Sequence, residues 1–217
     1  MKVKVCGLRE PENIAAVNGL GVDYLGLIFH PDSPRFAGQE SLSEWIGDNV
    51  AEFSETDLVG VFVNGEIDYL LNTVHDYHLD WVQLHGKESP GYCQELKLLW
   101  SVNTLRKASI AKAFPITPDF NFRQTDAYAG SCGLFIFDTG GQAAPGGTGT
   151  KWDWSKLDEY RGPVPFLLSG GIGPDDAAAI AAVNHPQFKG IDLNSRFETE
   201  PGIKDVERLR GFLSQLP

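Results

Sequence analysis

Short apolar runs alternate with amphipathic stretches along the whole chain. Eight of the runs are rich in β-branched and aromatic residues and carry apolar side chains on both faces, which is typical of buried parallel strands. They cover residues 3–6, 23–29, 58–63, 81–84, 110–116, 134–138, 164–168 and 190–194. The hydrophobic pattern therefore predicts eight β-strands.

The segments between these runs place apolar residues on one helical face, at spacings of three and four. Three such sets are Ile67, Leu70, Leu71 and Val74; Tyr92, Leu96 and Leu99; and Ile203, Val206, Leu209 and Leu213. Pro174, Asp175 and Asp176 precede an alanine-rich run, as at the start of a helix, because acidic side chains favour the positive end of the helix dipole. These segments are expected to be helical.

This alternation favours a (β/α)8 TIM barrel, which we expect to form a single catalytic domain over residues 1–217. An open doubly wound sheet is the alternative. Its dinucleotide-binding form has a G-x-G-x-x-G turn after the first strand, whereas this chain has Cys6-Gly7-Leu8-Arg9-Glu10 there. No linker, low-complexity tract or block of like charges divides the sequence.

The charge balance narrows the choice of partners. Lys and Arg number 18 against 29 Asp and Glu, a formal net charge of −11, so we expect neither nucleic acid nor a membrane surface as partner. A small anionic substrate stays open, because a local site can oppose the global charge. The sequence shows no signal-peptide pattern and no apolar run long enough to span a membrane. Its three cysteines form no C-x-x-C pair, so we expect a cytoplasmic protein without a disulfide framework or zinc finger.

The first candidate catalytic residue is Cys6, at the end of the first predicted strand. Active sites of such barrels lie at the carboxyl ends of the strands. Lys4 lies two residues before Cys6 on the same face, and its ammonium is expected to lower the pKa of the thiol. The alternative for Lys4 is a buried structural pair with Asp192 on the last strand. Both interpretations can hold together.

Further polar side chains stand at other strand ends. Asp138 ends the apolar run 134–137, where it either caps the next turn or is held protonated by apolar surroundings, as an acid catalyst requires. Arg35, on a proline-braced turn, suits bidentate binding of a carboxylate. Gln83 could donate to substrate oxygens. His85, on the same face, is by itself more typical of a hydrogen-bonded scaffold, but we expect both side chains to contact the substrate.

Glycine turns at the last two strand ends indicate a phosphate site. Gly170 and Gly171 turn the seventh predicted strand into a helix, and backbone N–H groups there can bind a phosphate without a lysine. The alternative is a tight turn that needs positive φ. Ser195 and Arg196 would add a hydroxyl and a guanidinium to the same phosphate.

Residues 140–149 form a glycine-rich stretch that is long for a connection after a barrel strand, and long loops of this kind are often functional. We expect Gly147 within it to contact the substrate. The five histidines are scattered along the chain, so we expect no metal site and no cofactor.

Six motifs occur in order along the chain: Lys4-Val5-Cys6-Gly7-Leu8, Ser33-Pro34-Arg35, Val59-Gly60-Val61-Phe62-Val63-Asn64, Gln83-Leu84-His85-Gly86, Gly146-Gly147-Thr148-Gly149 and Pro201-Gly202-Ile203-Lys204-Asp205. Together they resemble the phosphoribosylanthranilate isomerase family of tryptophan biosynthesis, and the likeness covers essentially the whole chain. It implies an Amadori rearrangement of N-(5′-phosphoribosyl)anthranilate, an aminoaldose, to 1-(2-carboxyphenylamino)-1-deoxyribulose 5-phosphate by acid–base catalysis.

The resemblance also implies residue roles. It makes Cys6 the general base and Asp138 the general acid, and it places Arg35 on the substrate's carboxylate. It places Gly170, Gly171, Ser195 and Arg196 around the phosphate. Residues 194–198 depart from the pattern: they are Asn-Ser-Arg-Phe-Glu where many members are similar to Ser-Ser-Gly-Val-Glu. We expect the guanidinium of Arg196 to take over part of the phosphate binding of the replaced glycine.

Two other functions stay open on the sequence. The related barrel isomerase of histidine biosynthesis would share the glycine loops, but it usually has Asp rather than Cys at the end of the first strand, and a half-barrel repeat. A non-catalytic sugar-phosphate-binding barrel is the second, although the presence of Cys6 and Asp138 speaks against it. In each case we expect a monomer or homodimer that binds a small phosphorylated molecule.

Overall fold

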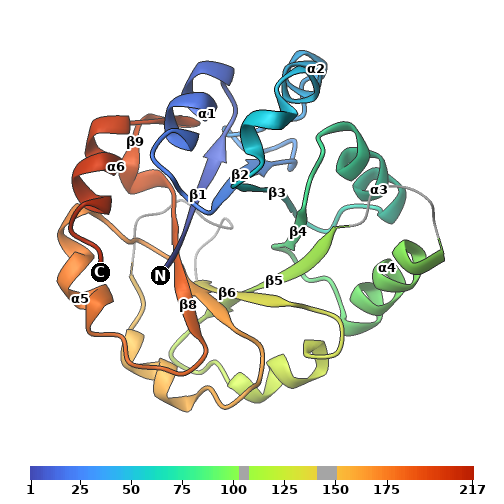
Figure 1. The fold of residues 1–217 in the computed structure, drawn as a ribbon. Helices are drawn as coiled ribbons and strands as arrows, with labels where there is room; N and C mark the ends of the chain where they lie inside the picture. The colour runs from blue at the N-terminus through green and yellow to red at the C-terminus, as the bar shows by residue number, and fades with distance from the viewer. Residues whose placement is uncertain (103–107, 141–150) are drawn as a thin grey trace.

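The chain forms a closed barrel of parallel strands, shown in Figure 1. The structure is a computed structural model that describes residues 1–102, 108–140 and 151–217. Each strand is hydrogen-bonded to the next, and β8 pairs with β1 to close the ring. The strands are β1 (Lys2–Leu8), β2 (Tyr24–Ile28), β3 (Asp57–Phe62), β4 (Trp81–Leu84), β5 (Ser109–Ile116), β6 (Leu134–Thr139), β7 (Phe166–Leu168) and β8 (Phe188–Leu193). The prediction of eight strands in a TIM barrel is confirmed.

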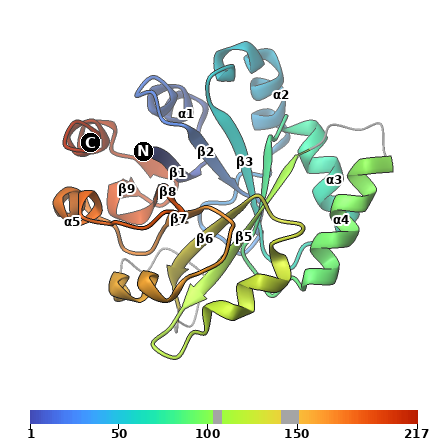
Figure 2. The same ribbon diagram turned by 60° about the horizontal axis from the view of Figure 1, so that its bottom comes forward.

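Helices and turns connect the strands on the outside of the ring (Figures 1 and 2). The first four connections carry α1 (Pro11–Asn18), α2 (Glu40–Asp48) with η1 (Val50–Phe53), α3 (Ile67–Asp76) and α4 (Pro90–Val102). The next three carry mainly 3-10 turns, namely η2 (Phe122–Tyr128), η3 (Trp154–Glu159) and η4 (Pro174–Asp176), the last followed by the short α5 (Ala177–Ala181). No helix in the described ranges is both long enough and apolar enough to cross a membrane.

The segment after β8 differs from the expectation. It contains η5 (Ser195–Phe197) and a small antiparallel sheet of β9 (Glu198–Glu200) and β10 (Ile203–Lys204) before α6 (Val206–Leu213). Ile203 therefore lies in a strand rather than on the predicted helix face. The helix begins later because the Asp205 carboxylate caps it, accepting from the Arg208 amide at 3.0 Å.

Side-chain alternation along the strands creates two apolar layers. Val3 and Val5 of β1 belong to the large core between the barrel and its helices. A second, smaller cluster fills the inside of the barrel and comprises Tyr24, Val59, Ala111, Ala113, Leu134, Ile136 and Leu167. Because side chains alternate between faces, Lys4 and Cys6 point the opposite way from Val3 and Val5, into the barrel.

Candidate active site

The inward positions near the carboxyl ends of four strands carry polar side chains. Cys6 of β1, Gln83 of β4, Asp138 of β6 and Asp192 of β8 are all buried. The apolar cluster closes the barrel interior beneath them, so these side chains are largely removed from bulk water. The structure thus brings Cys6 and Asp138 to one end of the barrel.

Cys6 lies against a buried ion pair. Lys4 Nζ is 3.0 Å from Asp192 Oδ1, and the charge of the Lys4 ammonium also acts on the Cys6 thiol. Burial raises the pKa of Cys6, and the opposing charges of Lys4 and Lys204 do not overcome it. Lys4 acts in the expected direction and lowers the pKa of this thiol, but burial is the larger influence and the net shift is upward. The structural pairing of Lys4 with Asp192 is confirmed.

Two glycines, Gly26 and Gly7, shape the backbone and the space around Cys6. Gly26 of β2 pairs directly with Cys6, and a Cβ on Gly26 would lie 2.9 Å from Cys6 Sγ. Gly7 has a φ of +81°, in the region that favours glycine. The sequence analysis missed Gly26, although a glycine within a strand often marks a place where another group approaches closely.

Asp138 lies in a chain of hydrogen-bonded side chains. Its Oδ2 is 3.3 Å from His85 Nε2, and Gln83 Nε2 is 2.8 Å from His85 Nδ1. The Asp138 Oδ1 accepts from the Thr139 amide at 2.8 Å. Burial favours the protonated carboxyl, but the hydrogen bond from His85, its charge and the Thr139 amide outweigh burial and lower the pKa of Asp138. The interpretation that apolar surroundings hold Asp138 protonated is wrong, because its hydrogen-bond partners outweigh burial.

The turn after β7 has the backbone that a phosphate loop needs. Gly170 and Gly171 have φ values of +95° and +67°. A Cβ on Gly170 would overlap Thr139 and lie 3.0 Å from Asp138 Oδ1, so this turn packs directly against the Asp138 carboxyl group. The Gly173 amide, two residues after Gly171, donates to Asp176 Oδ2 at 2.7 Å.

Ser195 and Arg196 lie in η5, beside that turn. A Cβ on Gly173 would be 3.8 Å from Arg196 Nε, so the exposed Arg196 side chain passes next to the β7–η4 turn. This position fits the expectation that Arg196 adds a cation to the phosphate site. Gly147, also expected to contact substrate, lies outside the described residues.

Arg35 is held by residues that the sequence analysis did not single out. Arg35 Nη2 lies 2.7 Å from Glu198 Oε2, and Lys204 Nζ lies 2.6 Å from Glu198 Oε1. Both Glu198 and Lys204 come from the β9–β10 sheet, which the sequence pattern did not predict. The motif Pro201-Gly202-Ile203-Lys204-Asp205 was the signal that this segment has a role.

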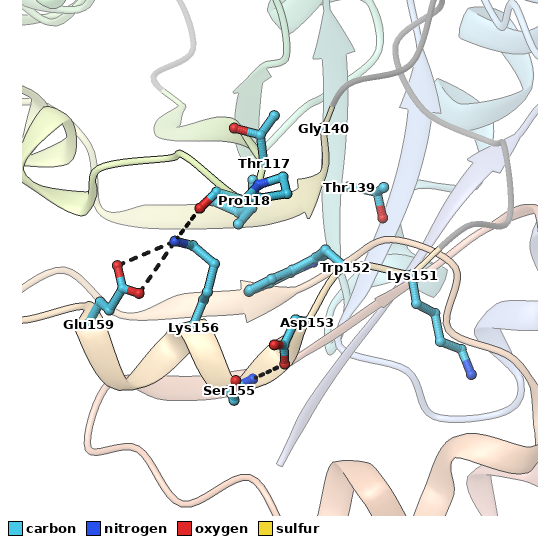
Figure 3. A pocket seen from close by; sticks show the side chains of 11 residues that line it. Thr117, Pro118, Thr139, Gly140, Lys151, Trp152, Asp153, Ser155, Lys156 and Glu159 are labelled. Atoms are coloured by element: carbon cyan, nitrogen blue, oxygen red, sulfur yellow. Dashed lines mark hydrogen bonds and ion pairs between the residues drawn. The ribbon is translucent and has the colours of Figure 1, made fainter.

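A cavity of about 640 Å³ lies at the carboxyl ends of β5 and β6 (Figure 3). Its wall includes Thr139, the residue after Asp138, and Trp152, whose indole Nε1 donates to the Ser169 carbonyl at 3.0 Å. Lys151 also lines it and pairs with Asp176 at 2.5 Å. The cavity therefore adjoins the end of β6 that carries Asp138.

In residues 1–102, 108–140 and 151–217, no three His, Cys, Asp or Glu side chains gather in a way that would hold a metal ion. The chemistry that the described side chains offer is proton transfer by a thiol, a carboxyl group and an imidazole.

A family model described as N-(5′phosphoribosyl)anthranilate (PRA) isomerase matches residues 3–215 of this chain. The chain belongs to the N-(5′-phosphoribosyl)anthranilate isomerase family. A curated family member from Parabacteroides distasonis is 44% identical over 216 residues, covering 100% of this chain and 93% of the relative. A second family member, from Phocaeicola vulgatus, is 37% identical over 216 residues, and the match covers 100% of this chain and 98% of the relative.

Solved phosphoribosylanthranilate isomerases have the same fold. The Thermus thermophilus structure has a TM-score of 0.80 at 25% identity, covering 99% of this chain and 98% of that one. A second solved structure has a TM-score of 0.74 at 26% identity, and the match covers 99% of this chain and 97% of that one. That enzyme is in complex with reduced 1-(o-carboxyphenylamino)-1-deoxyribulose 5-phosphate. The chain is accordingly an isomerase of tryptophan biosynthesis that acts on a small phosphorylated molecule.

Proposed function

We propose that Cys6 is the general base and Asp138 the general acid of an Amadori rearrangement. In this proposal the substrate is N-(5′-phosphoribosyl)anthranilate and the product is 1-(2-carboxyphenylamino)-1-deoxyribulose 5-phosphate. The observation that carries the assignment is the placement of Cys6 and Asp138 on inward positions at one end of the barrel, in a chain that belongs to this isomerase family.

The first step opens the sugar ring. Asp138 donates its proton to the ring oxygen, and the C1′–O bond breaks as the nitrogen lone pair forms a C1′=N double bond. The second step moves a proton from carbon. The Cys6 thiolate removes the proton on C2′, the electron pair of that C–H bond forms a C1′=C2′ double bond, and the electrons of the C1′=N bond return to nitrogen. The resulting enolamine gives the ketose when C1′ takes up a proton and the hydroxyl on C2′ loses one. General acids and bases of this kind contribute about 10²–10⁴-fold each.

The lowered pKa of Asp138 sets a requirement on the first step. The acid has to acquire its proton in the substrate complex, since hydrogen bonds hold it ionised in the ligand-free enzyme despite its burial. A phosphate bound at Gly170 and Gly171 would place negative charge next to Asp138, because the Gly170 backbone packs against Oδ1. Like charge disfavours the carboxylate form, so substrate binding would raise the pKa of Asp138.

Substrate recognition would be divided between two sides of the barrel mouth. Arg35 on the β1–β2 side would bind the carboxylate of the anthranilate ring through its guanidinium. The turn at Gly170 and Gly171, with Ser195 and Arg196, would bind the phosphate. Gly140 and Lys151, which flank the segment that contains Gly147 in the sequence, line the cavity beside Thr139, and we propose Gly147 as a further substrate contact.

The experiment that tests the proposed roles follows the loss of phosphoribosylanthranilate fluorescence with the purified enzyme and with Cys6→Ser and Asp138→Asn. Each variant should lose turnover while it still binds the reduced product analogue. A variant with turnover close to that of the parent would show that its residue has another role.

The state and location of the enzyme are also proposals. Its composition supports a cytoplasmic enzyme. A solved relative from Thermotoga maritima is described as dimeric, and we propose a monomer or homodimer for this chain. Sedimentation equilibrium of the purified enzyme distinguishes the two.

A further inference from the structure

Arg35 is bound to a buried carboxylate, that of Glu198, which is 5% exposed. Arg35 Nε lies 2.8 Å from Glu198 Oε1, and Nη2 lies 2.7 Å from Oε2, so the two groups form a bidentate pair. The same carboxylate accepts from Lys204 Nζ at 2.6 Å and from the Gly202 amide at 3.2 Å. Arg35, Glu198 and Lys204 are called the Glu198 cluster below.

The β9–β10 sheet fixes the Glu198 cluster to the barrel. Asn13 of α1 bonds both backbone groups of Lys204: its Nδ2 donates to the carbonyl at 2.9 Å, and its Oδ1 accepts from the amide at 2.8 Å. Lys204 Nζ also donates to Asn194 Oδ1 at 2.8 Å. Gly202, at a φ of +91°, lets the chain turn between the two strands. The position of Glu198 is therefore determined from several sides.

A guanidinium has two edges that can each bind a carboxylate through two parallel N–H bonds. Glu198 occupies the edge formed by Nε and Nη2 of Arg35. The edge formed by Nη1 and Nη2 faces away from Glu198. Because the guanidinium is planar and rigid, fixing one edge also fixes the direction of the other.

The fixed guanidinium lies next to the proposed base. A Cβ on Gly7, the residue after Cys6, would lie 2.7 Å from Arg35 Cδ and 2.7 Å from Asn194 Oδ1. Arg35 therefore packs over the backbone that carries Cys6. A carboxylate bound to the outer edge of Arg35 would be held at a set position relative to the thiol.

We propose that Glu198 is a positioning residue for substrate recognition: it aims the outer edge of Arg35 at the carboxylate of the substrate. The inference rests on the proposed role of Arg35. A glutamine at this position would offer one acceptor oxygen where the carboxylate receives four N–H contacts, from Arg35 Nε and Nη2, Lys204 Nζ and the Gly202 amide. Its NH2 group would face the cations, so Arg35 would lose its fixed orientation.

The test measures dissociation constants for two ligands. One is reduced 1-(o-carboxyphenylamino)-1-deoxyribulose 5-phosphate, and the other is the same compound with a phenyl ring that lacks the carboxyl group. Glu198→Gln should raise the dissociation constant of the carboxylated ligand about tenfold and change that of the other ligand by less than about twofold. Binding of the second ligand also shows that the variant is folded. Glu200→Gln, at an exposed position of the same strand, is the matched control and should change neither value.

Arg35→Ala and the double variant separate this inference from the proposed function. In an Arg35→Ala background, Glu198→Gln should have no further effect on the carboxylated ligand, because the group that it positions is absent. Suppose that Arg35→Ala weakens binding of the carboxylated ligand only. If Glu198→Gln then weakens binding of both ligands equally, or of neither, the inference about Glu198 is overturned and the role of Arg35 stands. If Arg35→Ala fails to distinguish the two ligands, the proposed carboxylate site itself is wrong.

Discussion

Gly26 of β2 lies directly beside Cys6 of β1, and a Cβ on Gly26 would be 2.9 Å from both Cα and Sγ of Cys6. Such a separation is well inside van der Waals contact, so the absence of a side chain at residue 26 sets the space in which the thiol sits. The neighbouring strand thus determines the position of the proposed base.

Gly26→Ala should reduce turnover by displacing Cys6. A shift of the thiol by about 1 Å would lower kcat about 10²-fold. Gly47→Ala is the control, because a Cβ there meets nothing closer than His78 at 3.7 Å and the residue lies within α2. Steady-state kinetics of both variants check the prediction. Equal kinetics for Gly26→Ala and the parent would mean that the position of Cys6 does not limit the reaction.

The pH dependence of kcat/KM should be flat around neutrality. Burial raises the pKa of Cys6. Burial also opposes ionisation of Asp138, but His85 and the Thr139 amide outweigh this effect, so the pKa of Asp138 is lowered. Between these two pKa values one proton is shared by the pair, and the major form has a Cys6 thiol and an ionised Asp138. The reactive form has a Cys6 thiolate and a protonated Asp138, so it is the minor form. Its fraction is constant between the two pKa values, which predicts a plateau from about pH 6.5 to about pH 8.5.

Outside that plateau kcat/KM should fall below the pKa of Asp138 and above the pKa of Cys6. Rates measured in buffers of constant ionic strength check the profile, with correction for ionisation of the substrate's phosphate near about pH 6. A narrow bell with its maximum near neutrality would contradict the assignment of raised and lowered pKa values to these two groups.

His85→Ala should move the acidic fall of kcat/KM to higher pH. Burial is the largest single influence on the pKa of Asp138 and raises it, and the hydrogen bond and charge of His85 are the strongest influences that oppose burial. Removal of the imidazole should therefore raise the pKa of this carboxyl group. His75→Ala serves as the control, since His75 is an exposed histidine on α3 that pairs only with its neighbour Asp76 among the contacts described. An unchanged acidic limb in His85→Ala would show that His85 does not control the ionisation of Asp138.

Arg35→Ala should act mainly on binding. Loss of the guanidinium should raise KM about tenfold or more and change kcat by only a few-fold. Glu198 keeps its partner Lys204 at 2.6 Å, so the cluster does not leave a buried carboxylate without a cation. Arg210→Ala on the exposed side of α6 is the control. An unchanged KM would contradict the proposed carboxylate site.

The sequence predicted the barrel because buried strands need apolar side chains on both faces, and such runs stand out from the amphipathic segments between them. It also located Cys6 and Asp138, since both end apolar runs where barrel chemistry takes place. The directions in which the pKa values of these two groups are shifted could not be predicted in the same way. They depend on burial and on partners distant in sequence, such as His85 for Asp138.

The residues that the sequence analysis missed act through packing between distant segments. Gly26 matters because β2 pairs with β1, and a strand glycine alone does not reveal which neighbour needs the space. Glu198 and Lys204 lie on the β9–β10 sheet, and the apolar spacing from Ile203 predicted a helix there instead. Their pairing with Arg35 becomes visible only when strand β8 closes the barrel beside β1.

The measurement that tests the central claim most directly combines turnover and binding for Cys6→Ser. A serine hydroxyl is a far weaker base than a thiolate, so the account predicts that kcat falls about 10²–10⁴-fold. The dissociation constant of reduced 1-(o-carboxyphenylamino)-1-deoxyribulose 5-phosphate should stay within about threefold, because the thiol is proposed to act on a C–H bond and not to hold the ligand. Turnover by Cys6→Ser within a few-fold of the parent, with binding intact, would contradict the assignment of Cys6 as the base.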